Sequence, residues 1–156
     1  MSHSPQHSNG LTHQHFILDA ELKAPLDFSK RHEITNELIN DLLKALGMEK
    51  LGPLEIYDAV DPTYPGWSFI QPITTSHISG HYFEEKNQPS HIRMDIYSCK
   101  EFDEELVITI TSNLLKLSDW SATLIDRNIL QKDRLVTYVD GYAEVIKEKK
   151  PYSIQK

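Results

Sequence analysis

Four residues with reactive side chains lie within one stretch of this 156-residue chain, between positions 68 and 99. They are Ser68, Ser76, His81 and Cys99, and Cys99 is the only cysteine in the sequence. Hydroxyl, imidazole and thiol groups can serve as nucleophile, base and proton donor. The residues between them alternate or run apolar as strands do, so the stretch predicts a catalytic site on neighbouring strands.

The spacing limits how these four side chains can meet. Successive side chains of a strand point to opposite faces, so Ser76 and His81 can meet only where the strand bends or bulges. Gly80 is a place where a bulge can form. A hairpin return could bring Ser68 alongside Ser76, and the next strand could bring Cys99 there.

The elements that must position this stretch follow from the apolar periodicity. Helical spacing is predicted from Ser29, as N-cap, to Gly47, as C-terminal residue, and again over residues 102–117. The second helix is predicted despite the β-branched residues at 107–111. Strands are predicted over residues 15–22, 51–60, 67–73, 76–83, 91–98, 120–125 and 135–139. This order indicates an α+β fold, a two-layer sandwich with helices on one face of a mainly antiparallel sheet.

The chain length indicates one domain, which we expect over residues 13–150. Residues 1–12 are expected to form a disordered N-terminal lead, and residues 151–156 a tail. We expect His3, His7 and His13 to be disordered-tail residues. The lysines at 147, 149 and 150 are interrupted by glutamate, which is typical of a solvated segment.

Charge and composition exclude several classes of partner. The net charge of −7 argues against nucleic-acid binding, because phosphate contacts need a concentrated basic surface. No apolar run approaches the ~20 residues that a membrane span needs. The polar N-terminus lacks the features of a signal peptide, and a single cysteine cannot form an internal disulfide. These features predict a cytoplasmic protein.

Histidine and cysteine are also zinc ligands, so a metal site has to be considered. His77 and His81 together with His91 or Cys99 are the candidate ligands. The sequence contains neither an HExxH nor a CxxC pattern. We therefore expect no metal here.

The run Thr75-Ser-His-Ile-Ser-Gly-His81, followed by Tyr82-Phe-Glu-Glu85, resembles the motif of bacterial and archaeal S-adenosylmethionine decarboxylases. Downstream, Asp95-Ile-Tyr-Ser-Cys99 is similar to a second segment of these enzymes. Their spacing of five residues between the serine and the second histidine is kept. The upstream serine is present at Ser68 after a Pro-Gly turn, and the run from His15 to Asp19 resembles the opening strand more weakly.

The resemblance implies a proenzyme that cleaves itself between Thr75 and Ser76. Ser76 would become a pyruvoyl group, whose ketone forms a Schiff base with the substrate amine and accepts electrons when carbon dioxide leaves. It implies that His81 and Ser68 assist self-processing, and that Cys99 is the general acid that reprotonates the substrate carbon.

The resemblance also implies a substrate site and a quaternary state. Phe83 occupies the position of an aromatic residue that stacks on adenine, and Glu85 that of a glutamate that meets the ribose hydroxyls. Tyr64 or Trp67 could supply an opposing aromatic face. The implied function is decarboxylation of S-adenosylmethionine for spermidine synthesis, by a homodimer of processed protomers.

The chain departs from the family pattern close to these residues. Thr75 replaces a glutamate, Gly80 an aliphatic residue, and Tyr82 and Glu84 a threonine and a proline. With Arg93, these changes leave open a pyruvoyl-dependent decarboxylase of ornithine or arginine. An unprocessed, non-catalytic homologue that regulates a partner enzyme is a further alternative.

Overall fold

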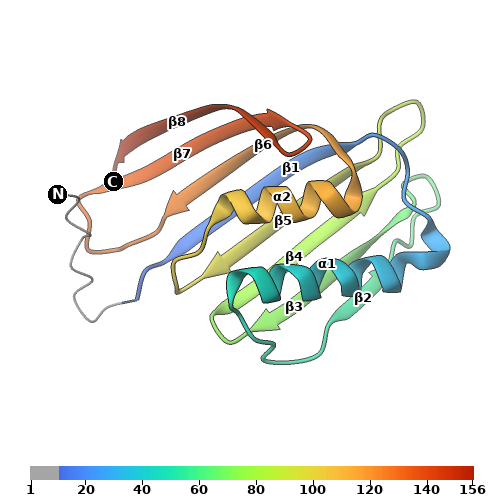
Figure 1. Ribbon diagram of the computed structural model, residues 1–156, viewed down its shortest axis with the longest axis horizontal. Helices are drawn as coiled ribbons and strands as arrows, with labels where there is room; N and C mark the ends of the chain where they lie inside the picture. Colours follow the sequence, from blue (N-terminus) through green and yellow to red (C-terminus); the bar gives the residue numbers. More distant parts are fainter. Residues whose placement is uncertain (1–10) are drawn as a thin grey trace.

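Eight strands form one antiparallel sheet, and two helices pack on one face of it in the computed structural model, which describes residues 11–156 (Figure 1). The strand order is β2-β3-β4-β5-β1-β6-β7-β8. The predicted α+β sandwich is thereby confirmed. Residues 1–10, most of the expected N-terminal lead, lie outside the described residues. The elements are β1 (Gln14–Leu22), α1 (Arg31–Leu46), β2 (Glu55–Asp58), β3 (Gly66–Ile73), β4 (Ser76–Phe83), β5 (His91–Ser98), α2 (Glu104–Leu115), β6 (Leu117–Asp126), β7 (Asp133–Tyr142) and β8 (Val145–Gln155).

The sheet has one apolar face, which packs against the helices, and one polar face. Alternate residues of the central strands, such as Phe16, Ile78 and Ile96, are fully buried in the core with the apolar sides of α1 and α2. Their neighbours in sequence point the other way. We call this second side the open face, and among residues 11–156 neither helix covers it (Figure 1). The open face carries His15, His77 and Asp95.

The first helix begins one residue later than predicted, with Lys30 at its N-cap position. A single 3-10 turn, Phe28–Lys30, precedes α1, and the Asp27 carboxylate accepts a hydrogen bond from the Ser29 backbone N–H. Asp27 thus caps this turn, and the prediction that Ser29 caps the helix was wrong. The predicted end is confirmed: Gly47 has φ 65°, and its N–H donates to the Leu43 carbonyl.

The β-branched run in the second helix is helical, as its apolar spacing predicted. Asp103 caps α2 by accepting from the Glu105 N–H, and Val107, Ile108 and Thr111 face the core. Burial of this face against the sheet therefore outweighs the local preference for strand. Neither helix of the described chain has the length and apolar character needed to cross a membrane.

The C-terminal segment differs most from expectation. Residues 151–156 were expected to form a tail, but β8 runs through to Gln155 and pairs with β7. Lys149 lies on this strand, and its ammonium group is 2.9 Å from the Glu104 carboxylate of α2. None of the side chains of β8 is buried, so its apolar periodicity is too weak to mark it in the sequence. The strand predicted over 51–60 is shorter, because only β2 pairs there.

Gly80 is required by packing. It lies opposite Phe69 in the β3–β4 register, and a Cβ atom at position 80 would lie 2.4 Å from Phe69 Cζ. The phenyl ring therefore fills the space that an aliphatic side chain at this position would need. This contact is a physical reason for the departure from the aliphatic residue of the resembled motif.

Replacing Gly80 with valine should lower the free energy of unfolding by about 1–3 kcal/mol, because overpacking forces the Phe69 ring to move. Urea unfolding measures this change. Combining Gly80→Val with Phe69→Leu should recover part of the loss, while Phe69→Leu alone serves as the matched control. A Gly80→Val variant as stable as the parent would contradict the packing argument.

Candidate active site

The Thr75–Ser76 peptide bond lies where the β3–β4 hairpin turns. Ile73 pairs with Ser76, so Thr74 and Thr75 form the two-residue turn. Ser76 has a φ of 146°, a backbone conformation that costs a non-glycine residue about 1–3 kcal/mol. Within residues 11–156 the buried Thr75 hydroxyl has no hydrogen-bond partner. This bond is therefore held in a strained environment.

Cys99 adjoins the same bond from the neighbouring strand. Ser76 pairs with Ser98 of β5, and the Cys99 backbone N–H donates to the Thr75 carbonyl oxygen at 2.8 Å. The expectation that the next strand brings Cys99 beside Ser76 is confirmed. The half-buried Cys99 also lines a cavity of about 440 Å³ near the C-terminal end of α1, together with Leu46 and Met48. Small molecules can thus approach this end of the sheet.

Ser68 and His81 lie together, but away from Ser76. They are directly opposite in the β3–β4 register, and Ser68 Oγ is 2.6 Å from His81 Nδ1. β4 contains no bulge, so the five residues from Ser76 to His81 span about 17 Å at 3.3 Å per residue. β4 therefore provides no bend at which Ser76 and His81 could meet within one chain. The hairpin return brings Ser68 opposite His81 and not alongside Ser76, because the hairpin pairs in regular register up to its turn.

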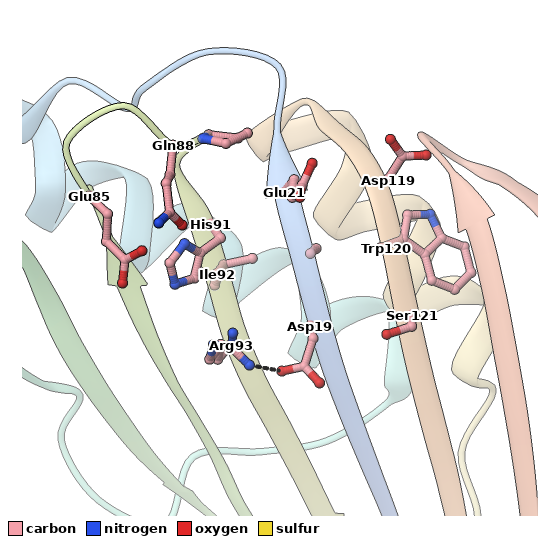
Figure 2. A pocket seen from close by; sticks show the side chains of 12 residues that line it. Asp19, Glu21, Glu85, Gln88, His91, Ile92, Arg93, Asp119, Trp120 and Ser121 are labelled. Carbon is pink, nitrogen blue, oxygen red and sulfur yellow. Dashed lines mark hydrogen bonds and ion pairs between the residues drawn. The ribbon is translucent and has the colours of Figure 1, made fainter.

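Phe83 and Glu85 lie at the Ser68–His81 end. The Phe83 ring lies beside the rings of His81 and His91, with centroid distances of 6.0 Å and 5.2 Å. Glu85, His91 and Arg93 line a cavity of about 390 Å³ (Figure 2). The predicted substrate residues thus lie near one another, next to a cavity large enough for part of a small molecule.

The walls of this cavity are strongly acidic. Arg93 donates to the Asp19 carboxylate at 3.1 Å, as the dashed line in Figure 2 marks. Glu21, Glu85 and Asp119 add further carboxylates. A ligand with positively charged groups suits this surface.

Two of the departures from the family pattern, Gly80 and Tyr82, lie on the helix side of the sheet. Tyr82 is buried on the helix side, where its hydroxyl donates to Glu84 and accepts from the Leu26 N–H. Burial chiefly raises the pKa of Tyr82 to about 12. Trp67 also faces the helices, and its indole N–H donates to Thr35 at 2.9 Å. Trp67 therefore cannot supply an aromatic face on the open side, whereas Tyr64 is exposed.

The structure also brings together residues that the sequence analysis did not connect. His15 of β1 and His77 of β4 both hydrogen-bond to the Asp95 carboxylate of β5, and the Ser79 hydroxyl donates to its other oxygen. Burial opposes ionisation of Asp95, but the hydrogen bonds from His15, Ser79 and His77 prevail and lower its pKa to about 2. Strand alternation places these residues on one face, but only the pairing of β4, β5 and β1 unites them.

His13 is another such residue. Its Nδ1 atom lies 2.5 Å from the Tyr97 hydroxyl, and the two rings stack with centroids 6.0 Å apart. The expectation that His13 belongs to a disordered tail was wrong, because the strand register brings Tyr97 to its side. His3 and His7 lie outside the described residues.

A family model for S-adenosylmethionine decarboxylase matches residues 14–128. This chain belongs to the S-adenosylmethionine decarboxylase family. The match runs from β1 to just beyond β6 and includes every candidate residue named above. A comparison with curated proteins found no match.

Membership of this family supports S-adenosylmethionine decarboxylase activity, a lyase reaction on a small molecule. The acidic cavity agrees with such a ligand, since S-adenosylmethionine carries both a sulfonium and an amino group. The match ends before β7, so the β7–β8 hairpin lies outside the part of the chain that defines the family.

The Asp95 network should contribute to stability in a pH-dependent way. Because the folded pKa of about 2 lies below the unfolded value, this stability is present at neutral pH and is lost as pH falls from about 5 to about 2. Asp95→Asn should lower the free energy of unfolding by about 2 kcal/mol at pH 7 and much less near pH 2. Urea unfolding of both proteins at both pH values measures the difference, with a chelator present so that no metal ion binds to the histidines. An equal loss of unfolding free energy at pH 7 and pH 2 would show that ionised Asp95 is not its cause.

Proposed function

We propose that this protein is a self-cleaving, pyruvoyl-dependent S-adenosylmethionine decarboxylase, cut between Thr75 and Ser76. The observation that carries the proposal is the hydrogen bond from the Cys99 N–H to the Thr75 carbonyl oxygen. This donor polarises the carbonyl group of the bond to be cut. It also stabilises the negative charge that develops on the oxygen when a nucleophile attacks, as an oxyanion-hole donor does.

Cleavage begins when the Ser76 hydroxyl attacks the Thr75 carbonyl carbon. The peptide C–N bond breaks, its nitrogen takes up a proton, and an ester links Thr75 to the Ser76 side chain. Elimination then releases the Thr75 carboxylate, and hydrolysis of the resulting enamine releases ammonia. The positive φ of Ser76 supports this scheme, because cleavage relieves the backbone strain.

A pyruvoyl group at position 76 would supply an electron sink for decarboxylation of a bound amine substrate. Cys99 is the residue that we assign to proton donation. Its half-buried thiol belongs to the residue whose N–H meets the Thr75 carbonyl. A donor in this position can protonate the substrate carbon once carbon dioxide has left.

The distance between Ser76 and the Ser68–His81 pair leads us to a homodimer. A two-fold axis that brings two open faces together can place the Ser68–His81 end of one copy over the Ser76 end of the other. Each site would then combine Ser76 and Cys99 from one protomer with Ser68, His81 and the substrate residues from its partner. The single-chain separation of about 17 Å is then no obstacle to joint action.

The substrate residues in this scheme are Phe83 and Glu85. The Phe83 ring lies against histidine rings on the open face, where an adenine could stack. The Glu85 carboxylate beside the cavity could accept hydrogen bonds from ribose hydroxyls. Spermidine synthesis in the cytoplasm is the role we assign, consistent with the family and with a single free thiol.

Self-cleavage predicts two fragments from the purified protein. Intact-mass measurement should find residues 1–75 and a second fragment that begins with a pyruvoyl group at position 76. Ser76→Ala should yield only the uncleaved chain, while Ser79→Ala, three residues along β4, should still be cleaved. A parent chain that stays intact at about 18 kDa after long incubation would contradict the proposal and favour an unprocessed regulatory homologue.

Cys99→Ala should separate cofactor formation from its use. The variant keeps the backbone N–H and should be cleaved, but release of carbon dioxide from S-adenosylmethionine should fall about 100-fold or more. Labelled ornithine and arginine, assayed in parallel with the parent protein, should release none. Strong release from either amino acid alone would assign the site to a basic amino acid instead.

Sharing of sites between two copies can be tested by complementation. Ser76→Ala and His81→Ala chains, each prepared alone, should remain largely uncleaved. Co-expressed, they can form a heterodimer in which one site has both an intact Ser76 and an intact His81. The His81→Ala chain should then be cleaved. Isolated heterodimers without any cleavage would show that Ser76 and His81 do not act across the interface.

A further inference from the structure

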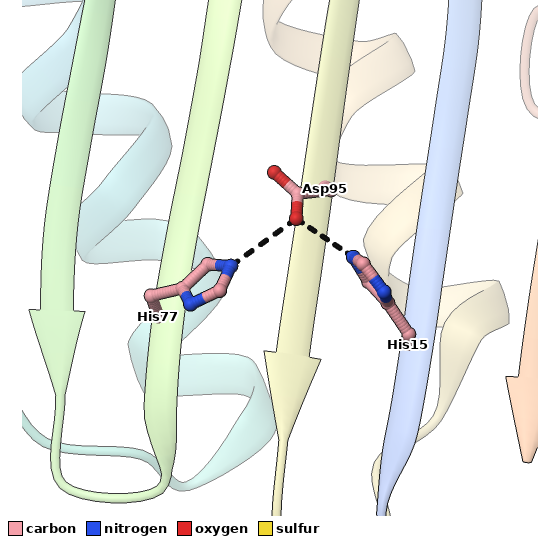
Figure 3. A group of neighbouring side chains, drawn as sticks. All are labelled: His15, His77 and Asp95. Atoms are coloured by element: carbon pink, nitrogen blue, oxygen red, sulfur yellow. Dashed lines mark hydrogen bonds and ion pairs between the residues drawn. The ribbon is translucent and has the colours of Figure 1, made fainter. Parts of the chain in front are cut away.

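A compact group of potential metal ligands lies on the open face, close to the Ser76 end of β4. His15, His77 and Asp95 come from β1, β4 and β5, which are adjacent in the sheet order. Figure 3 shows both imidazoles directed at one carboxylate oxygen. Nε2 of His15 is 2.7 Å from Asp95 Oδ2, and Nε2 of His77 is 3.2 Å from the same atom.

We propose that His15, His77 and Asp95 bind a divalent transition-metal ion, and that Zn²⁺ suits the group best. Their ligand atoms all lie within 4.8 Å of one another. Zinc bonds of about 2.0–2.1 Å in tetrahedral geometry put neighbouring ligand atoms about 3.3 Å apart. The His77 nitrogen is already close to this spacing from the carboxylate, and the His15 nitrogen needs to move away by about 0.6 Å.

The chemistry of the ligands selects the ion. Two imidazole nitrogens and one carboxylate oxygen form a set that zinc and other first-row transition metals accept, whereas Mg²⁺ and Ca²⁺ prefer oxygen alone. Without a metal, Nε2 of each imidazole donates its proton to Asp95 in a hydrogen bond. With the ion bound, Nε2 becomes the ligand atom and the proton of each neutral imidazole is on Nδ1. The side chains remain 22%, 42% and 27% exposed for His15, His77 and Asp95, so an ion can enter and a water can take the fourth position.

Neighbouring residues hold the three ligands in orientation. The Ser79 hydroxyl donates to Asp95 Oδ1, the oxygen that the histidines leave free. The Tyr97 ring packs against both imidazoles, with centroid distances of 5.9 Å to His15 and 5.8 Å to His77. Such outer contacts fix ring and carboxylate orientation in protein metal sites. The site therefore has a supporting shell as well as three ligands.

This site is distinct from the residues assigned to cleavage and decarboxylation, although His77 directly follows Ser76. A bound ion would tie β4, β5 and β1 together at the Ser76 end of the sheet. Zinc binding requires no cleavage of the chain. Its test is therefore independent of whether the pyruvoyl proposal holds.

The experiment uses full-length protein freed of metal by a chelator and dialysed before titration with Zn²⁺ by calorimetry. We expect one zinc ion per chain, confirmed by native mass spectrometry, and visible absorption of four- or five-coordinate Co²⁺ in the same site. His77→Gln should weaken binding by about 100-fold or more, and Ser79→Ala by about tenfold. Glutamine can still donate to Asp95, so circular dichroism of His77→Gln should match the parent.

Controls address three of the other imidazoles of the chain, at positions 3, 7 and 32. His32→Gln on α1 should bind zinc like the parent, and so should the double variant His3→Gln, His7→Gln. Loss of binding in that double variant, or unchanged affinity in a folded His77→Gln, would overturn the proposal. Absence of binding up to about 0.1 mM free zinc would overturn it too, because functional protein sites bind far more tightly.

Discussion

The regular pairing of β4 with β3 on one side and β5 on the other is the constraint on which the rest of this structure depends. With no bulge along its length, β4 directs Ile78, Gly80 and Tyr82 towards the helices, and the residues between them towards the open face. The same regularity keeps the Thr75–Ser76 bond and His81 at opposite ends of the strand. One paired strand therefore sets both the core and the layout of the candidate site.

This constraint also changes the meaning of the departures from the family pattern. Gly80 and Tyr82 belong to the core side, where one makes room for Phe69 and the other hydrogen-bonds to Glu84 and Leu26. They are thus part of a local repacking of the interior. Under the proposed function, substrate preference would come from open-face residues beside the acidic cavity, among which Arg93 is paired with Asp19.

The polar groups of the open face are held by cross-strand contacts. Asp95 receives hydrogen bonds from two other strands, and these outweigh the cost of its burial. Tyr97 packs against the histidines that surround it. Contacts of this kind hold side chains in place, which lowers the entropy lost when a ligand binds to a surface.

The sequence by itself determined the local features: the reactive residues, the family motif, the strands from β3 to β5 and the helix end at Gly47. These depend on short-range periodicity and on residue types that suit one backbone conformation. Only the tertiary structure decided that Ser68 joins His81 and not Ser76, that Cys99 reaches Thr75 through its backbone, and that His15 meets Asp95. The reason is physical: strand register pairs residues as far apart as His15 and Asp95, and it follows from packing of the whole sheet, which no local pattern encodes.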